Sequence, residues 1–84
     1  MNKLTLTETN RFMTSSVDYP LDSHDWIVGD TIEEKMVTLL NATCKYNDYS
    51  ITDGVLTATF GKVLKGQFGD SDVTVEKTFT VEAA

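Results

Sequence analysis

The dipeptide Asp53-Gly54 constrains the fold of this chain more than any other feature of its sequence. Both central residues of a type I′ hairpin turn need positive φ, which Asp and Gly tolerate, so the dipeptide is a favoured two-residue loop between antiparallel strands. A turn of this type fixes the register of the strands on either side of it. Three cross-strand pairs follow: Thr52 with Val55, Ile51 with Leu56, and Tyr49 with Ala58.

A second turn, Gly69-Asp70-Ser71-Asp72, predicts a further hairpin with a four-residue loop. This loop sets Phe68 opposite Val73 and hence Phe60 opposite Val81. Side chains alternate between the two faces of a sheet, and the two turns direct their apolar side chains to the same face. The predicted inner face consists of Tyr49, Ile51, Leu56, Ala58, Phe60, Leu64, Phe68, Val73, Val75, Phe79 and Val81. The predicted outer face consists of Ser50, Thr52, Thr57, Thr59, Gln67, Thr74, Glu76, Thr78, Thr80 and Glu82.

Two lysines, Lys62 and Lys77, interrupt the apolar pattern of the inner face. Gly61 stands beside Lys62, and a glycine inside a strand often marks a bulge. We therefore expect a bulge or a strand end here, which lets the two amines reach solvent.

Residues 31–45 carry the strongest helix signal of the chain. Asp30 or Thr31 is suited to cap the N-terminus, and Glu33 follows Asp30 by three residues, which is typical of a capping box. An apolar stripe recurs at helical spacing and is expected to pack on the sheet. It consists of Ile32, Met36, Leu39, Leu40 and Thr43.

The N-terminal third of the chain is less regular. Leu4 and Leu6 alternate with threonines over residues 3–9, which predicts a strand at one edge of the sheet. Residues 10–29 show no clear period and include Pro20, so we expect a long connection that packs on the core through its apolar side chains.

These elements predict an α+β fold, an antiparallel sheet of three or four strands with one helix, at about 31–45, packed on one face. At 84 residues the chain is long enough for one core and too short for two. We therefore expect a single domain over residues 1–84.

The charged residues are unevenly distributed along the chain. Its 13 acidic and 7 basic residues give a formal net charge of −6, which disfavours direct binding to nucleic acid or to an anionic membrane. Residues 18–34 hold six acids and no base, whereas seven acids and seven bases balance in the rest of the chain. The acids at 30, 33 and 34 interact favourably with a helix N-terminus, which leaves Asp18, Asp22 and Asp25 without a structural role.

The sequence offers little for catalysis. Cys44, the one cysteine, cannot form an internal disulfide, and its place at the edge of the helical stripe is typical of a small buried hydrophobe. His24 is the one histidine, and it lies directly between Ser23 and Asp25, where adjacent side chains point apart instead of forming a triad. We predict that the protein is not an enzyme and uses no metal or cofactor, with a small enzyme as the lowest-ranked alternative.

The N-terminal residues alternate with threonine, and no stretch reaches the roughly 18 apolar residues of a membrane span. We expect a soluble, cytoplasmic protein that does not contact a membrane.

We interpret the chain as a noncatalytic protein-binding module. Aromatic anchors dominate interface energetics and carboxylates steer toward positive charge, so the expected partner is a protein with a basic surface. The candidate contact residues are Asp18, Tyr19, Asp22, Asp25, Trp26, Glu33 and Glu34. In size, acidity and lack of catalytic residues the chain resembles the small inhibitors that bacteriophages direct against host nucleic-acid enzymes, which implies a nucleic-acid-processing host protein as the partner.

Two alternatives stay open. The acidic segment is also explained as a solvated loop and helix start with no partner. The chain is also compatible with a structural or assembly subunit that forms a homo-oligomer through a strand edge, because the first and last predicted strands carry few charges that discourage edge pairing.

Overall fold

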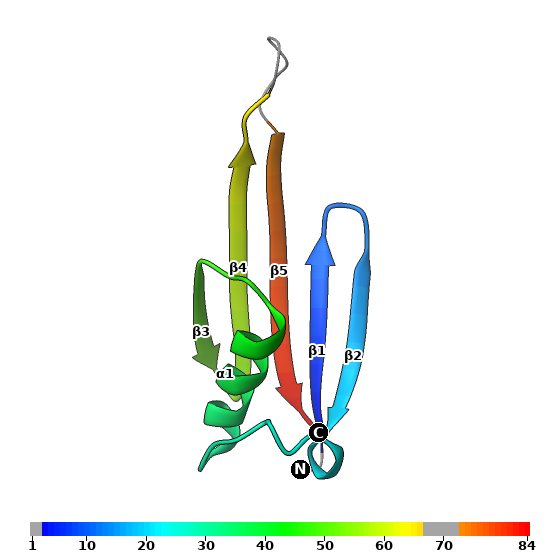
Figure 1. Cartoon of the computed structure of the whole chain (residues 1–84), viewed down its shortest axis with the longest axis vertical. Helices are drawn as coiled ribbons and strands as arrows, with labels where there is room; N and C mark the ends of the chain where they lie inside the picture. Colours follow the sequence, from blue (N-terminus) through cyan, green and yellow to red (C-terminus); the bar gives the residue numbers. More distant parts are fainter. Residues whose placement is uncertain (1–2, 67–72) are drawn as a thin grey trace.

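The structure is a computed structural model that describes residues 3–66 and 73–84. Within these residues, one antiparallel sheet of five strands runs along the long axis of the molecule, and one α-helix covers part of one face (Figure 1). The elements are β1 (Lys3–Asn10), β2 (Thr14–Pro20), the 3-10 turn η1 (Leu21–Ser23), α1 (Ile32–Thr43), β3 (Asp48–Thr52), β4 (Val55–Leu64) and β5 (Val73–Ala83). The predicted α+β class is confirmed, whereas the prediction of three or four strands is wrong, since the sheet has five.

The strand order is β2-β1-β5-β4-β3, and all neighbours are antiparallel. The N-terminal strand β1 and the C-terminal strand β5 are therefore adjacent and lie inside the sheet. The expectation that the first strand lies at one edge of the sheet is wrong. The chain crosses from the β2 edge to the β3 edge through α1, which is why those two strands are outermost.

The strand β2 lies in the segment that the sequence predicts to be a long connection. Asn10 starts the turn that leads into it, because its side-chain oxygen accepts hydrogen bonds from the backbone N–H groups of Phe12 (2.8 Å) and Met13 (2.9 Å). All of β2 except Tyr19 is exposed. A strand exposed on both faces needs no apolar alternation, so this one carries no periodic signal.

The hairpin of β3 and β4 is paired as predicted, with Ile51 opposite Leu56 and Tyr49 opposite Ala58. Its turn residues adopt the positive φ angles that the turn type requires, 53° at Asp53 and 77° at Gly54.

The register between β4 and β5 differs from the prediction by four residues. Leu64, and not Phe68, lies opposite Val73, and Leu56, and not Phe60, lies opposite Val81. A shift by an even number of residues leaves every side chain on its predicted face, so the hydrophobic pattern cannot distinguish the two registers. Phe68 and the predicted turn at 69–72 lie outside the described residues.

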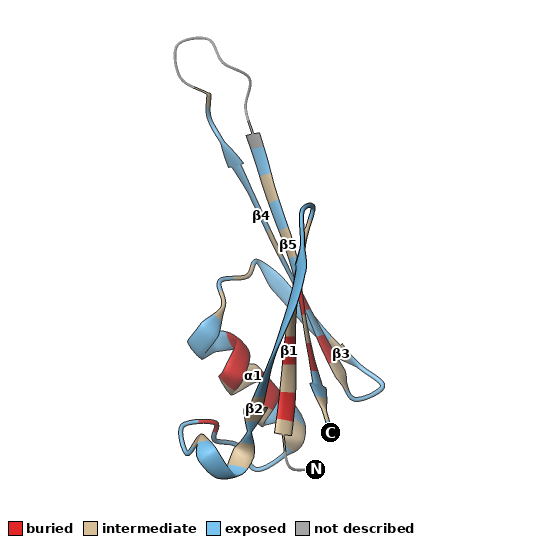
Figure 2. Cartoon of the chain, turned by 90° about the vertical axis from the view of Figure 1, so that its right-hand side faces the viewer, coloured by how far each residue is buried: buried red, intermediate tan, exposed pale blue. Residues whose placement is uncertain are grey.

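The core lies between α1 and the lower half of the sheet, and the upper parts of β4 and β5 extend beyond it (Figure 2). Its fully buried large side chains are Leu4, Met36, Leu39, Leu40, Leu56 and Val81. The helix does not reach the upper parts of β4 and β5, which we call the upper ribbon. Leu64, on the predicted inner face of this ribbon, is therefore 45 % exposed. The predicted bulge at Gly61 is also absent, because pairing runs without interruption from Leu56 to Leu64. Lys62 reaches solvent simply because nothing described covers the ribbon.

The helix α1 is shorter than the predicted range 31–45, and its N-cap is Thr31. The Thr31 hydroxyl accepts from the Glu34 N–H (3.2 Å) while the Glu34 carboxylate accepts from the Thr31 N–H (3.2 Å). This capping box is shifted by one residue from the predicted pair, Asp30 and Glu33. Cys44 follows the helix as its C-cap and packs, partly buried, against the core.

Candidate functional site

Three aromatic side chains, Tyr19, His24 and Trp26, form a cluster where β2 ends, which we call the aromatic corner. Their ring centroids lie 5.3 Å apart for Tyr19 and His24, 6.2 Å for Tyr19 and Trp26, and 5.8 Å for His24 and Trp26, each pair being edge-to-face. This arrangement places the positive edge of one ring against the negative face of the next. The three rings contact each other directly and so leave no space among them for a ligand.

The local sequence builds the aromatic corner. Pro20 ends β2, η1 reverses the chain, and the imidazole Nδ1 of His24 lies 2.8 Å from the Pro20 carbonyl oxygen. A carbonyl oxygen can only accept, so Nδ1 carries the proton of this hydrogen bond. Ile27 is buried and anchors the following segment to the core, which holds Trp26 at the surface with 43 % of its area exposed.

Asp18 does not belong to the aromatic corner. It precedes Tyr19 in β2 and therefore points to the opposite face of the sheet. Its carboxylate accepts a hydrogen bond from the Thr5 hydroxyl (2.8 Å) and forms an ion pair with the Lys3 ammonium (3.2 Å). The Thr5 hydrogen bond is the larger cause, and Lys3 the second, of a pKa of Asp18 below the usual value of an aspartate.

The two glutamates of the predicted set have different environments. The Glu34 carboxylate is part of the capping box and also accepts from the Asp30 N–H (2.5 Å). Glu33 is exposed and lines a hollow of about 530 Å³ together with Asp53 and Glu82. Glu34 thus stabilises the helix start, whereas the Glu33 carboxylate is available at the surface.

The hollow adds two carboxylates that the sequence does not link to the acidic segment. Asp53 lies in the β3–β4 turn and Glu82 near the end of β5, far from Glu33 along the chain. The alternation of β5 indicates that Glu82 points outward, but only the strand order places it beside the start of α1. From the sequence, Asp53 is explained fully as a turn residue, so nothing indicates that it also lines this hollow.

The acidic side chains therefore gather at the end of the molecule where α1 begins, β2 ends and the C-terminus lies (Figure 1). We call this region the acidic end. It holds eight acids and two bases, which account for the whole formal net charge of −6. The acids are Asp18, Asp22, Asp25, Asp30, Glu33, Glu34, Asp53 and Glu82, and the bases are Lys3 and Lys35. Asp22 and Asp25, on either side of His24, are exposed beside the aromatic corner.

The ion pairs of the described residues leave most carboxylates of the acidic end unpaired. Within residues 3–66 and 73–84 there are two ion pairs. The Lys3 ammonium lies 3.2 Å from the Asp18 carboxylate on the outer face, and the Lys77 ammonium lies 3.7 Å from the Glu8 carboxylate. In that part of the chain, no basic side chain neutralises Asp22, Asp25, Glu33, Asp53 or Glu82 through an ion pair.

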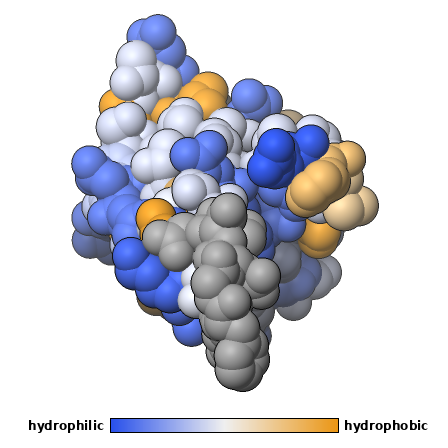
Figure 3. All heavy atoms as spheres, turned by 90° about the horizontal axis from the view of Figure 1, so that it is seen from above, coloured by the Kyte–Doolittle hydropathy of each residue, from blue (hydrophilic) through white to orange (hydrophobic). Residues whose placement is uncertain are grey.

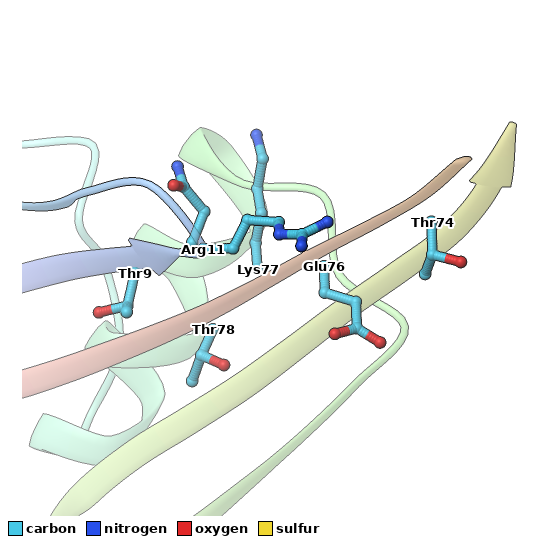
Figure 4. Close-up of a pocket in the computed structure, with 7 residues that line it drawn as sticks. Thr9, Arg11, Thr74, Glu76, Lys77 and Thr78 are labelled. Carbon is cyan, nitrogen blue, oxygen red and sulfur yellow. The ribbon is translucent and has the colours of Figure 1, made fainter.

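A groove of about 540 Å³ lies at the opposite half of the molecule, where β1 ends and β5 continues (Figure 4). Glu76 and Lys77, neighbours in β5, point to opposite sides of that strand in the close-up. Their charges therefore do not converge on one substrate position, and the groove is an open channel beside a strand edge.

No helix within the described ranges has the length and apolar character needed to cross a membrane. Among the same residues, no three histidine, cysteine or carboxylate side chains are grouped in a way that could hold a metal ion. The chain matches no protein-family model, no curated protein and no solved structure.

Proposed function

We propose that this chain is a noncatalytic protein-binding domain that docks on a basic partner through its acidic end. The observation that carries the proposal is that the whole formal charge of −6 lies at the end of the molecule that also carries the half-exposed Trp26. Of the contact residues predicted from the sequence, we retain Tyr19, Asp22, Asp25, Trp26 and Glu33. Asp18 and Glu34 are replaced by Asp53 and Glu82, because the first two are engaged within the fold.

Two physical effects act together in this proposal. Unpaired carboxylates at one end attract a positively charged surface and accelerate its approach, an effect that salt screens over about 8 Å at physiological ionic strength. Trp26 is held by its ring contacts, so its burial in a partner costs little side-chain entropy. Its exposed area also suits an arginine or lysine of the partner, stacked as a cation on the ring.

The more specific form of the proposal is an inhibitor of a nucleic-acid-processing protein. Such proteins present basic surfaces to phosphate groups. A domain with its negative charge at one end can occupy such a surface in place of the nucleic acid.

Affinity purification from the native host, followed by mass spectrometry, names the partner, and binding measurements on purified components then test the surface. The decisive variant is Asp22→Asn with Asp25→Asn. The matched control, Asp48→Asn with Glu76→Gln, removes the same charge from sites outside the acidic end.

We expect the first variant to bind at least about tenfold more weakly at low salt, because two steering charges beside the anchor are lost. The control should stay within about twofold of the unchanged chain. Trp26→Ala should weaken binding at every salt concentration, since burial of an aromatic ring is not screened. Equal losses in both double variants, or binding that ignores both salt and these substitutions, would show that the acidic end is not the docking surface.

A further inference from the structure

The backbone of β2 presents hydrogen-bonding groups that the described part of the fold leaves open. In an antiparallel sheet each residue directs its N–H and C=O to one neighbouring strand, and the next residue directs both to the other side. Lys3 exchanges both bonds with Ala84 beyond the end of β5, at 3.2 and 3.0 Å, so the odd residues of β1 bond to β5. Asn10 donates to the Met13 carbonyl at 3.0 Å, so the even residues of β1 bond to β2.

The register then fixes which groups of β2 point outward. Leu4 lies opposite Tyr19 and Leu6 opposite Val17, so the odd residues of β2 bond to β1. The N–H and C=O groups of Thr14, Ser16 and Asp18 therefore point away from the sheet. Figure 1 shows no described element on that side of β2.

The other free edges are shorter or covered. By the same alternation β3 presents only Tyr49 and Ile51, and the upper part of β5 presents only Thr74 and Glu76. The edge of β4 above β3 is partly covered, because the Asn47 side chain accepts from the Gly61 N–H. Proteins protect edge strands with charged side chains, bulges or prolines. β2 has Pro20 at its end and one charged residue, Asp18, whose carboxylate is bound to Lys3 and Thr5 of β1.

We propose that a second copy of this chain pairs with the outer edge of β2, antiparallel and about a two-fold axis at Ser16, to form one continuous sheet. In this register Ser16 lies opposite its own counterpart and Thr14 lies opposite Asp18. Every outward N–H and C=O of these three residues then has a partner. A register moved toward Pro20 is poorer, because proline has no N–H and the Pro20 carbonyl already accepts from His24.

The same register brings complementary surfaces together. The β1–β2 turn of one copy lies over the aromatic corner of the other, with Met13 opposite Tyr19. Phe12 is 87 % exposed and Met13 is 62 % exposed, and both are apolar groups that pairing would cover. Seen from above relative to Figure 1, a hydrophobic patch lies at the right side of the molecule, next to strongly hydrophilic atoms (Figure 3).

Charge favours the same arrangement. Arg11 precedes Phe12 in the turn, and in this register the turn faces the end of β2 in the other copy, the end from which the chain continues to Asp22 and Asp25. Antiparallel pairing also sends the two acidic ends in opposite directions, which limits their repulsion. The two-fold axis repeats each favourable contact, as self-complementary interfaces require. This inference does not depend on the proposed function, although the pairing would cover the aromatic corner and so compete with a basic partner.

The experiment compares Ser16→Lys with Thr57→Lys by sedimentation velocity, from micromolar to millimolar concentration. Ser16 and Thr57 stand in one row across the outer face, linked through Thr7 and Thr80, but Thr57 lies in β4 and away from the edge. The unchanged chain and Thr57→Lys should shift with concentration from the 9.3 kDa monomer to twice that mass. Ser16→Lys should dimerise at least about tenfold more weakly, because two like charges face each other at the axis.

Amide hydrogen exchange on the unchanged chain provides a readout that does not depend on any variant. The amides of Ser16 and Asp18 should exchange more slowly as concentration rises, while that of Val17, already bonded to β1, should not change. A chain that stays monomeric at millimolar concentration overturns the proposal. So does a dimer that Ser16→Lys leaves intact, that Thr57→Lys weakens equally, or that leaves the outward amides of β2 unprotected.

Discussion

Asp18 and Tyr19 are neighbours in β2, and their side chains lie on opposite faces of the five-stranded sheet. Asp18 is bound to Thr5 and Lys3 on the outer face, while the Tyr19 ring contacts His24 and Trp26. A segment that is continuously acidic and aromatic in sequence is therefore divided by strand geometry into two surfaces. The binding surface that we propose lies on the Tyr19 side, continues to the start of α1, and reaches the outer face through Glu82.

The environment of Asp18 predicts a measurable titration behaviour. The Thr5 hydroxyl, and after it the Lys3 ammonium, lower the pKa of Asp18, so Thr5→Val should raise this pKa toward its usual value. Because the pKa is lower in the folded chain than in the unfolded one, the stabilisation is present above the unfolded pKa. It is lost as the pH falls through the folded value.

Titration of the Asp18 carboxyl carbon by NMR tests this prediction. Thr7→Val is the control, because the Thr7 hydroxyl is 2.9 Å from the Ser16 hydroxyl on the same face and is not bonded to Asp18. An Asp18 titration that Thr5→Val leaves in place, or that Thr7→Val moves as far, would contradict the assigned cause.

Local chemistry was enough to predict the elements whose own residues define them. Asp53 and Gly54 specify a turn that only one register satisfies, and the pairing of Ile51 with Leu56 follows from it. The helical stripe likewise predicts the burial of Met36 and Leu39. In each case the deciding interactions join residues that are close in sequence.

The features that depend on distant residues were not accessible in this way. The hydroxyl-rich strand β2 is exposed on both faces, so no alternation marks it. The β4–β5 register changes by four residues without moving any side chain to the other face. The acidic end receives Asp53 and Glu82 only because β3, β4 and β5 pair beside α1, an arrangement that no local spacing encodes.

Because α1 covers only part of the apolar face of the sheet, substitutions by alanine along this face should lower the free energy of unfolding by very different amounts. Phe79 is 4 % exposed beneath α1, so Phe79→Ala should lower the free energy of unfolding by about 3 to 5 kcal/mol. Leu64 is on the same face but 45 % exposed on the upper ribbon, so Leu64→Ala should cost less than about 1 kcal/mol. Urea unfolding measures both values. Similar losses of unfolding free energy at the two positions would contradict the prediction, because they would mean that Leu64 is packed as firmly as Phe79.

Gly29 holds the Trp26 segment against α1, which predicts that Gly29→Ala disturbs both stability and the aromatic corner. Its φ is 156°, and an added Cβ would lie 2.7 Å from the Glu34 Cβ and 2.9 Å from the Lys35 backbone nitrogen. These atoms belong to the first turn of the helix and cannot move aside cheaply. We expect the backbone of the Gly29→Ala variant to shift away from α1 and to weaken the 2.7 Å hydrogen bond from the Thr38 hydroxyl to the Val28 carbonyl.

Gly54→Ala is the control, because its φ of 77° is also positive and therefore unfavourable for alanine, but no neighbouring heavy atom lies within 4 Å of an added Cβ. It should cost only the conformational term, about 1 to 2 kcal/mol. Gly29→Ala should exceed that cost in urea unfolding and should also change the fluorescence of Trp26, since the segment that carries this ring has moved. If the two substitutions cost the same and the tryptophan emission is unaltered in both, the contact between residue 29 and the helix start does not position the aromatic corner.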